Sequence, residues 1–241
     1  MVDQESAYYE PAYYKLATGY VLALEGETPF PPLSNALTEP NGLIAIGGDL
    51  NSTRLLSAYK QGIFPWFNEG EPVMWWSPNP RMVLFPDELK ISNSLKKTLK
   101  KHTFETRINT AFQAVMIKCS QTPRHGQSGT QSNTWISPDM IAAYCGLHAL
   151  GFAMSAETWQ DGKLVGGCYG VKIGRMFYGE SMFHHVTDAS KVAFVHLVET
   201  LKNQNVSMID CQMKTPLLTS FGGREIKREE FMQNLSKLVN F

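Results

Sequence analysis

The sequence has no excess of charge of either sign, because 22 Lys and Arg residues balance 22 Asp and Glu residues. The chain as a whole therefore produces no long-range field that would indicate a polyanionic partner, although a local basic patch is compatible with neutrality. No apolar run is long enough to span a bilayer, and the acidic, tyrosine-rich N-terminus is unlike a signal peptide. We therefore expect a cytoplasmic protein that has no membrane partner.

Patterns that form disulfides or bind metals are also missing. The six histidines form no H-E-x-x-H or comparable ligand pair, so we expect no metal site. The four cysteines lie in apolar surroundings without C-x-x-C spacing: Cys119, Cys145, Cys168 and Cys211. We interpret them as free thiols in a reducing compartment.

Several catalytic motifs are absent as well. There is no G-x-S-x-G, no P-loop, no S-x-x-K constellation and no G-x-G-x-x-G after a strand. Residues 171–175, VKIGR, lack the full glycine pattern of a loop that binds the pyrophosphate of acetyl-CoA. The chemistry must therefore come from another arrangement of side chains.

Local patterns predict a protein of the α+β class. Cap residues and apolar spacing predict helices over 52–59, 92–101, 109–119, 137–150 and 188–204. Turn residues and apolar runs predict strands over 152–160, 163–171, 176–183 and 206–212. This order of helices, antiparallel meander, helix and strand is that of N-acetyltransferase-like acyl-transfer domains.

We expect a small, loop-rich N-terminal domain over 1–80, with 1–29 as a variable extension, and an acyl-transfer domain over 81–241. Three Trp and four Pro within about twenty residues predict a rigid, aromatic-lined loop surface rather than a helix or a central strand.

The short apolar strand MIDCQ carries Asp210 and Gln212 two residues apart. Because side chains alternate along a strand, the two polar groups should share one face, and Cys211 should point to the other. One reading is a polar pair that is merely satisfied at a strand end. The functional reading is a relay in which Asp210 accepts from the Gln212 amide, and the Gln212 carbonyl orients an attacking amine.

Glu180 lies in the segment YGESMF, within an otherwise apolar hairpin. It is either the partner of a nearby lysine or backbone N–H, or a carboxylate of the functional site. The neighbouring Gly179 would allow a ligand to come close, and Ser181 could donate a hydrogen bond there.

Four tryptophans and a lysine cluster suggest a nucleic-acid partner. Any one of Trp66, Trp75, Trp76 and Trp135 could simply fill the core, but their clustering in loops favours contact with a ligand such as a nucleobase. The lysine cluster consists of Lys96, Lys97, Lys100 and Lys101. These side chains either form a solvated helix face or bind phosphate groups of a nucleic acid.

Several rare motifs together resemble the leucyl/phenylalanyl-tRNA–protein transferase family. They follow the family's order over most of residues 30–231: EPNGLIAIGGDL (39–50), AYKQGIFPWF (58–67), WWSPNPR (75–81), TWI (134–136), LVGGCYGV (164–171), FYGESMF (177–183), ASK (189–191) and IDCQ (209–212).

The resemblance implies a monomeric enzyme without cofactor or metal. Such enzymes move Leu or Phe from aminoacyl-tRNA to the N-terminal amine of proteins that begin with Arg or Lys, which marks them for degradation. Because an apolar pocket discriminates poorly by one methylene, we expect that Met could be used as well. The resemblance also implies an N-acetyltransferase-like C-terminal domain, with Trp66 and Trp135 at the terminal adenosine. Phe177 and Ile209 would line the amino-acid pocket, Asp210 and Gln212 would form the relay, and Glu180 would be a further site carboxylate.

The chain departs from the family pattern at a few positions. Phe152, Met154 and Leu217 stand where many members carry histidine, and Cys168 occupies a pocket position that Met or Leu usually fills. Two alternatives to the transferase stay open: a CoA-dependent N-acyltransferase on the same fold, and a non-catalytic tRNA-binding paralogue.

Overall fold

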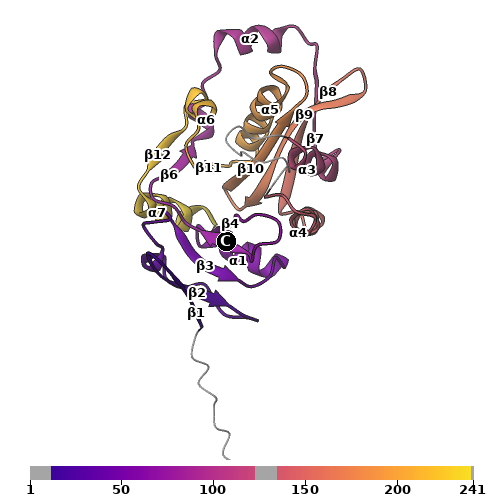
Figure 1. The fold of residues 1–241 in the computed structure, drawn as a ribbon. Helices are drawn as coiled ribbons and strands as arrows, with labels where there is room; N and C mark the ends of the chain where they lie inside the picture. Colours follow the sequence, from indigo (N-terminus) through magenta and orange to yellow (C-terminus); the bar gives the residue numbers. More distant parts are fainter. Residues whose placement is uncertain (1–11, 123–134, 240–241) are drawn as a thin grey trace, which may run out of the picture.

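The computed structural model describes residues 12–122 and 135–239, and these residues form two β-sheets with helices packed around them (Figure 1). The α+β class is therefore confirmed. The N-terminal sheet has the strand order β1-β2-β3-β5-β4. Its strands are β1 (Tyr13–Leu16), β2 (Gly19–Leu24), β3 (Leu43–Gly47), β4 (Phe64–Pro65) and β5 (Met74–Trp76).

The larger sheet has the strand order β12-β6-β11-β10-β9-β8-β7. All its pairs are antiparallel except β10 with β11, which is parallel. Its strands are β6 (Arg81–Leu84), β7 (Glu105–Ile108), β8 (Ala153–Gln160), β9 (Lys163–Ile173), β10 (Met176–His184), β11 (Met208–Gln212) and β12 (Arg224–Ile226).

The predicted helices form, and most begin at the expected caps. The side chains of Asn51, Ser92 and Ser137 each accept a backbone N–H in the first turn of their helix. Asp188 makes no such cap bond, because its carboxylate accepts instead from Lys191 and Thr98. The helices are α1 (Ser52–Lys60), α2 (Asn93–Lys100), α3 (Phe112–Ser120), α4 (Pro138–Ala149), α5 (Ala189–Asn203), α6 (Pro216–Ser220) and α7 (Arg228–Val239).

Two expectations for the N-terminal domain need correction. Residues 13–24 are not a mere extension, since they form β1 and β2, and Val21, Leu22 and Leu24 are buried. The Trp-rich segment also contributes an interior strand, β5, where Trp75 is completely buried and donates to the carbonyl of Gly47. The Ser-, Gln-, Gly- and Thr-rich composition of residues 120–133 predicts a loop, and most of this segment lies outside the described residues.

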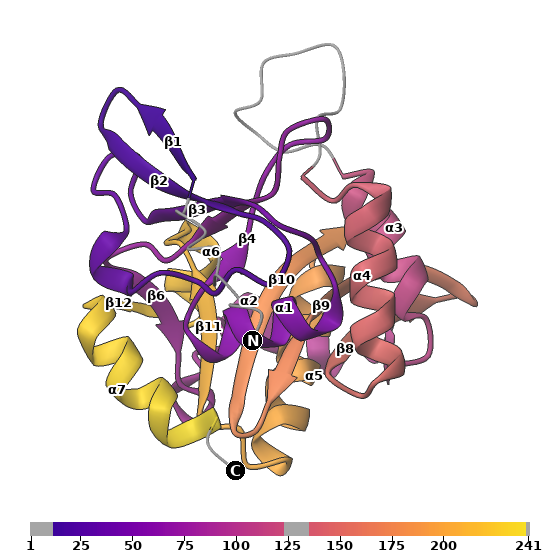
Figure 2. The ribbon, with the colours of Figure 1, turned by 90° about the horizontal axis from the view of Figure 1, so that it is seen from below.

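The larger sheet separates two hydrophobic cores. One core contains α1, α3, α4, α7 and the N-terminal sheet, and the other contains α5. Successive residues of β10 alternate between them, with Met176 and Tyr178 in the first and Phe177 in the second. Seen from below, α1 lies between α7 and α4 at the end of this sheet (Figure 2). The N-terminal part is thus packed into the same core as the C-terminal part.

Candidate active site

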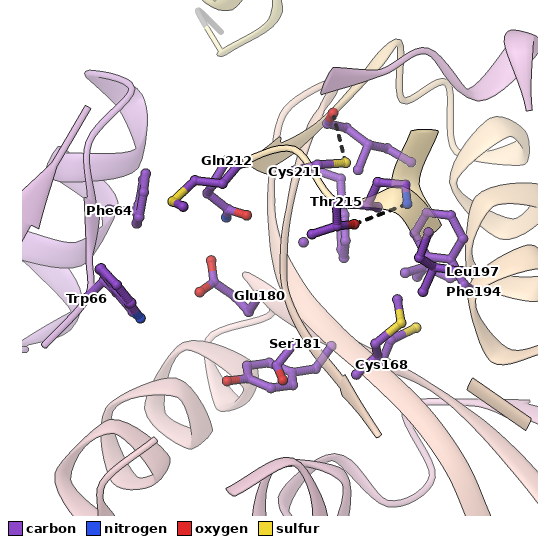
Figure 3. Close-up of a pocket in the computed structure, with 18 of the residues that line it drawn as sticks. Phe64, Trp66, Cys168, Glu180, Ser181, Phe194, Leu197, Cys211, Gln212 and Thr215 are labelled. Carbon is purple, nitrogen blue, oxygen red and sulfur yellow. Dashed lines mark hydrogen bonds between the residues drawn. The ribbon is translucent and has the colours of Figure 1, made fainter. Parts of the chain in front are cut away.

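A cavity of about 710 Å³ lies where β10 and β11 part. The two strands pair over only three residues, from Met176 with Met208 to Tyr178 with Asp210. Beyond that point β10 carries Glu180 and Ser181 into the cavity wall, and β11 carries Gln212 into it. Phe64, Pro65 and Trp66 close the cavity from the N-terminal side. Residues from the N-terminal part of the chain and from the larger sheet therefore build one site (Figure 3).

One half of the cavity is apolar. The predicted pocket residues Phe177, Ile209 and Cys168 all line it and are almost fully buried. Burial raises the pKa of the Cys168 thiol, so this group stays protonated and behaves as a small apolar side chain. The other lining residues of this half come from α5, α6 and the strand ends: Met182, Phe194, Leu197, Leu217 and Leu218.

The four tryptophans divide into core and cavity residues. Trp66 lines the cavity with 42% of its surface exposed, and its backbone carbonyl accepts from the indole N–H of Trp76. The rings of Trp66 and Trp76 meet edge to face, with centroids 5.7 Å apart. Trp135 also lines the cavity but is 6% exposed. Trp66 therefore offers an accessible aromatic face, and Trp135 forms part of the wall.

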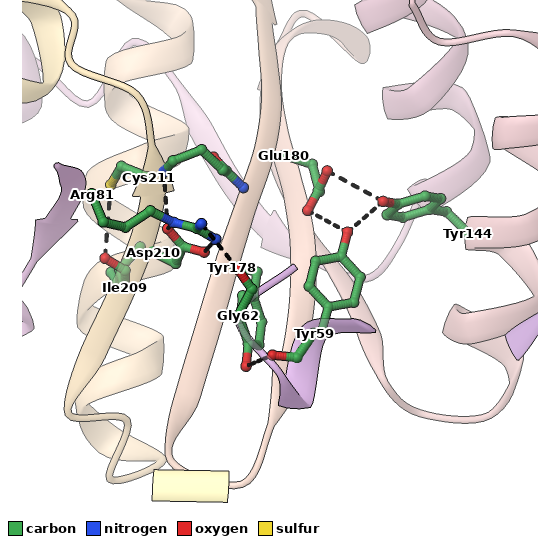
Figure 4. A network of polar contacts seen from close by, with 10 residues as sticks. Tyr59, Gly62, Arg81, Tyr144, Tyr178, Glu180, Ile209, Asp210 and Cys211 are labelled. Carbon is green, nitrogen blue, oxygen red and sulfur yellow. Dashed lines mark hydrogen bonds and ion pairs between the residues drawn. The ribbon is translucent and has the colours of Figure 1, made fainter. Parts of the chain in front are cut away.

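Glu180 is held by two tyrosines from two different helices (Figure 4). The hydroxyl of Tyr59 donates to its Oε1 at 2.6 Å, and the hydroxyl of Tyr144 donates to its Oε2 at 3.3 Å. The two hydroxyls also contact each other. Burial raises the pKa of Glu180 to about 8, although both tyrosine hydrogen bonds act in the opposite direction.

Asp210 is placed differently from the predicted relay. Its side chain is fully buried and binds the guanidinium of Arg81 through two hydrogen bonds, from Nε at 2.8 Å and from Nη2 at 2.7 Å. Its Oδ1 also accepts the backbone N–H of Gln212 at 2.9 Å, rather than the side-chain amide. Asp210 thus acts on the backbone of Gln212 from behind the cavity wall.

The expectation that Asp210 and Gln212 share a face is wrong, because β11 is irregular between them. The pairing with β6 shifts register at this point, and Gln212 has φ +55°, in the left-handed region. Gln212 therefore reaches the cavity while Asp210 does not. Cys211, which was expected to point away, lines the cavity as well.

The predicted lysine cluster is exposed. Lys96, Lys97, Lys100 and Lys101 lie on or next to α2, which is anchored through the buried Leu95. Figure 1 shows α2 at the end of the molecule opposite the N-terminal sheet. Within the described ranges no group of His, Cys, Asp and Glu could hold a metal ion, and no helix is long and apolar enough to cross a membrane.

The model of the leucyl/phenylalanyl-tRNA protein transferase family matches residues 83–236, and the model of that family's N-terminal domain matches residues 48–79. The chain belongs to the leucyl/phenylalanyl-tRNA–protein transferase family. The enzyme of this name from Chromobacterium violaceum is 59% identical over 213 residues, which are 88% of this chain and 89% of that relative. The enzyme from Nitrosospira multiformis is 58% identical over 218 residues, which are 90% of this chain and 92% of that relative.

Two solved structures resemble this transferase distantly. L-PGS from Bacillus licheniformis is 9% identical and covers 83% of this chain and 72% of its own, with a TM-score of 0.43. A GCN5-related N-acetyltransferase from Kribbella flavida is also 9% identical and covers 73% and 61%, with a TM-score of 0.38.

Three further site residues of this transferase escaped prediction from the sequence. The helical spacing places Tyr59 on the apolar side of α1, and Tyr144 lies among apolar residues of α4, so neither position predicts a polar role. Arg81 ends the motif WWSPNPR, where it is 1% exposed and also stacks on the rings of Phe64 and Phe231. A charged residue between prolines and an apolar strand was the available signal, since a buried arginine requires a partner.

Proposed function

We propose that the protein transfers Leu, Phe and also Met from aminoacyl-tRNA to the N-terminal α-amine of proteins that begin with Arg or Lys. The observation that carries this proposal is a single cavity with an apolar half and a polar edge. Cys168, Phe177 and Ile209 line the apolar half, while Glu180 and Gln212 form the edge. In Figure 3 these two polar side chains lie between Trp66 and the apolar half.

The apolar half suits an aliphatic or aromatic side chain without strong discrimination among them. One methylene changes binding in an apolar pocket by only about 1–3 kcal/mol, so overlapping use of Leu, Phe and Met is expected. On the opposite side, Trp66 would stack on the terminal adenosine, a contact of about 1–3 kcal/mol. Trp135 would complete the wall of that subsite, and Ser181 lies at the polar edge.

The reaction would be direct aminolysis. An aminoacyl ester is already activated, so catalysis needs the amine and the ester in register more than a covalent intermediate or a cofactor. An α-amino group has a pKa near 8, so about a tenth is neutral at pH 7. Gln212 would orient this amine. The carboxylate of Asp210 would hold Gln212 in place by accepting the backbone N–H of Gln212.

The CoA-dependent alternative finds little support in the backbone. Residues 171–175 form the end of β9 and the turn into β10, and do not lead into a helix. The segment between β10 and the next helix, α5, comprises residues 185–188 and has no glycine. A loop that binds pyrophosphate needs its backbone N–H groups at a helix N-terminus.

The non-catalytic alternative rested on the replaced histidines. Phe152 packs against the first core and Met154 lies in the second, and neither lines the cavity. Of the three positions only Leu217 does. Two of the three replacements are therefore remote from the proposed chemistry, which favours an active enzyme.

The decisive experiment charges tRNA with radiolabelled Leu, Phe or Met and offers a peptide that starts with Arg. Label should enter this peptide and one that starts with Lys, but not the same peptide with an acetylated N-terminus. Binding of charged tRNA without transfer would support the non-catalytic alternative, and transfer from acetyl-CoA would support the other. We further propose a monomeric, cytoplasmic enzyme whose products are marked for degradation.

A further inference from the structure

Glu180 differs from every other group that lines the cavity. Among the described residues that form the wall it is the only carboxylate, and none of them is a His, Lys or Arg. It is half-buried, on the stretch of β10 that no longer pairs with β11. Its carboxyl group is therefore the wall's only candidate to exchange a proton with a substrate near neutral pH.

Two phenols fix the orientation of this carboxyl group. Tyr59 and Tyr144 are fully buried and donate to different oxygens of Glu180. Burial, followed by the proximity of Glu180, raises the pKa of both phenols well above the ordinary value. They stay protonated and serve as donors throughout the neutral range, which leaves Glu180 as the titrating member of the trio.

The charges that face Glu180 come from the neighbouring strands. Asp210 on β11 raises the pKa of Glu180, and Arg81 on β6 lowers it. Since these two form a buried ion pair with each other, their effects on Glu180 oppose one another. Burial is the largest cause of the raised pKa, and the phenols of Tyr59 and Tyr144 counteract it.

Gln212 and Asp210 are poorly suited to receive the proton of the amine. The amide of Gln212 is neutral and a very weak base. The carboxylate of Asp210 lies behind the wall, with its oxygens occupied by Arg81 and by the backbone N–H of Gln212. Orientation of the amine and removal of its proton therefore fall to different residues.

We propose that Glu180 is the proton acceptor of the transfer reaction, and that Tyr59 and Tyr144 are its positioning residues. This inference rests on the proposed function. The neutral amine nitrogen bonds to the ester carbonyl carbon and loses one proton to Glu180. The bond from that carbon to the ribose oxygen then breaks, and the protonated Glu180 returns the proton to the departing oxygen. The products are an amide and a free ribose hydroxyl, and Glu180 is again a carboxylate.

The test measures kcat for transfer of Phe from Phe-tRNA to a saturating Arg-initiated peptide between pH 6 and 9, with the uncatalysed loss of ester subtracted. In the wild type, kcat should rise with pH along an ascending limb whose apparent pKa is near 8. Glu180→Gln should lower kcat about 10²–10⁴-fold and leave the peptide KM within a few-fold. Its residual profile should show only the limb of the acceptor amine.

Tyr59→Phe provides a second variant that keeps the carboxyl group. Because the hydrogen bond from Tyr59 favours the charged form of Glu180, its loss should move the limb to higher pH. Tyr178→Phe is the matched control, since it removes a buried hydroxyl that donates to the backbone carbonyl of Tyr59 and not to Glu180. Its limb should coincide with that of the wild type.

Three results would overturn the assignment of Glu180, and a fourth would overturn the proposed function. Near-normal kcat in Glu180→Gln, or an unmoved limb in Tyr59→Phe, would overturn the assignment. A raised peptide KM with unchanged kcat in Glu180→Gln would also overturn it, and would make Glu180 a recognition group for the acceptor's basic side chain. If the wild type transferred nothing at any pH, the proposed function itself would fail.

Discussion

The guanidinium of Arg81 and the carboxylate of Asp210 form a two-bond ion pair in which the side chains are 1% and 0% exposed. Arg81 also donates to the carbonyl of Gly62 at 3.0 Å, so the pair connects the end of α1 to β11. A buried charge whose partner is removed costs about 3–5 kcal/mol. Asp210 therefore contributes to stability as well as to the site.

Asp210→Ala should lower the free energy of unfolding by about 3–5 kcal/mol, because it leaves Arg81 charged and buried without its partner. Transfer should largely disappear, and binding of aminoacyl-tRNA should stay measurable at low temperature. Urea unfolding and a transfer assay on the same preparation measure both effects. Full transfer activity in this variant would contradict a role for Asp210 in the reaction.

The double variant Arg81→Met, Asp210→Leu separates the two roles. Replacement of a buried ion pair by apolar residues of similar volume is often neutral for stability, so much of the lost unfolding free energy should return. Activity should stay low, because nothing then accepts the backbone N–H of Gln212. Recovery of activity together with stability would mean that Asp210 is purely structural.

Cys168→Met should change the preference among transferred amino acids. The added side-chain volume enters the apolar half of the cavity, so transfer of Phe should fall relative to Leu by about 10-fold or more. Competition between the two charged tRNAs gives the ratio of kcat/KM directly. Cys145→Met on α4, outside the cavity wall, is the control and should leave the ratio unchanged.

Trp66→Ala should weaken binding of an aminoacyl-adenosine analogue by about 1–3 kcal/mol, through loss of a stacking face. Trp66→Phe should recover part of the affinity, since it restores an aromatic ring. Titration calorimetry at fixed salt measures both. Equal affinity in the wild type and Trp66→Ala would show that the adenosine binds elsewhere.

Replacement of the four lysines at 96, 97, 100 and 101 by Gln should weaken tRNA binding and flatten its dependence on salt. The log–log slope should fall by about 0.7–0.9 for each phosphate that the variant no longer neutralises. Four exposed lysines on other parts of the surface are the matched control: Lys60, Lys163, Lys227 and Lys237. An unchanged slope in the first variant would mean that α2 only presents a solvated face.

Local signals predicted helices α1–α5 and strands β8–β11, but not the contacts between elements. The caps Asn51, Ser92 and Ser137 act within their own first turn, so the sequence reveals them. The strands β6, β7 and β12 have only three or four residues, too few for a period to emerge. The C-terminal helix α7 was also missed, although its buried residues follow a helical spacing.

The site shows the same division. Membership of Glu180, Gln212, Phe177 and Ile209 in one cavity was predicted from motifs, and they do meet there. The bulge before Gln212 was not predicted, because the alternation of side chains that we assumed holds only for a regular strand. The partners of Glu180 come from α1 and α4, far away in the sequence. No local pattern states that two helical tyrosines converge on one carboxylate.

The parting of β10 and β11 has a consequence for the N-terminal helix α1. One short chain segment binds both sides of the gap: Tyr59 binds Glu180 on β10, and Gly62 binds Arg81, which binds Asp210 on β11. The four residues from Tyr59 to Gly62 thus set the spacing between the proposed proton acceptor, Glu180, and the proposed amine-orienting residue, Gln212. Exchange of α1 between relatives should alter turnover without touching a substrate-binding side chain.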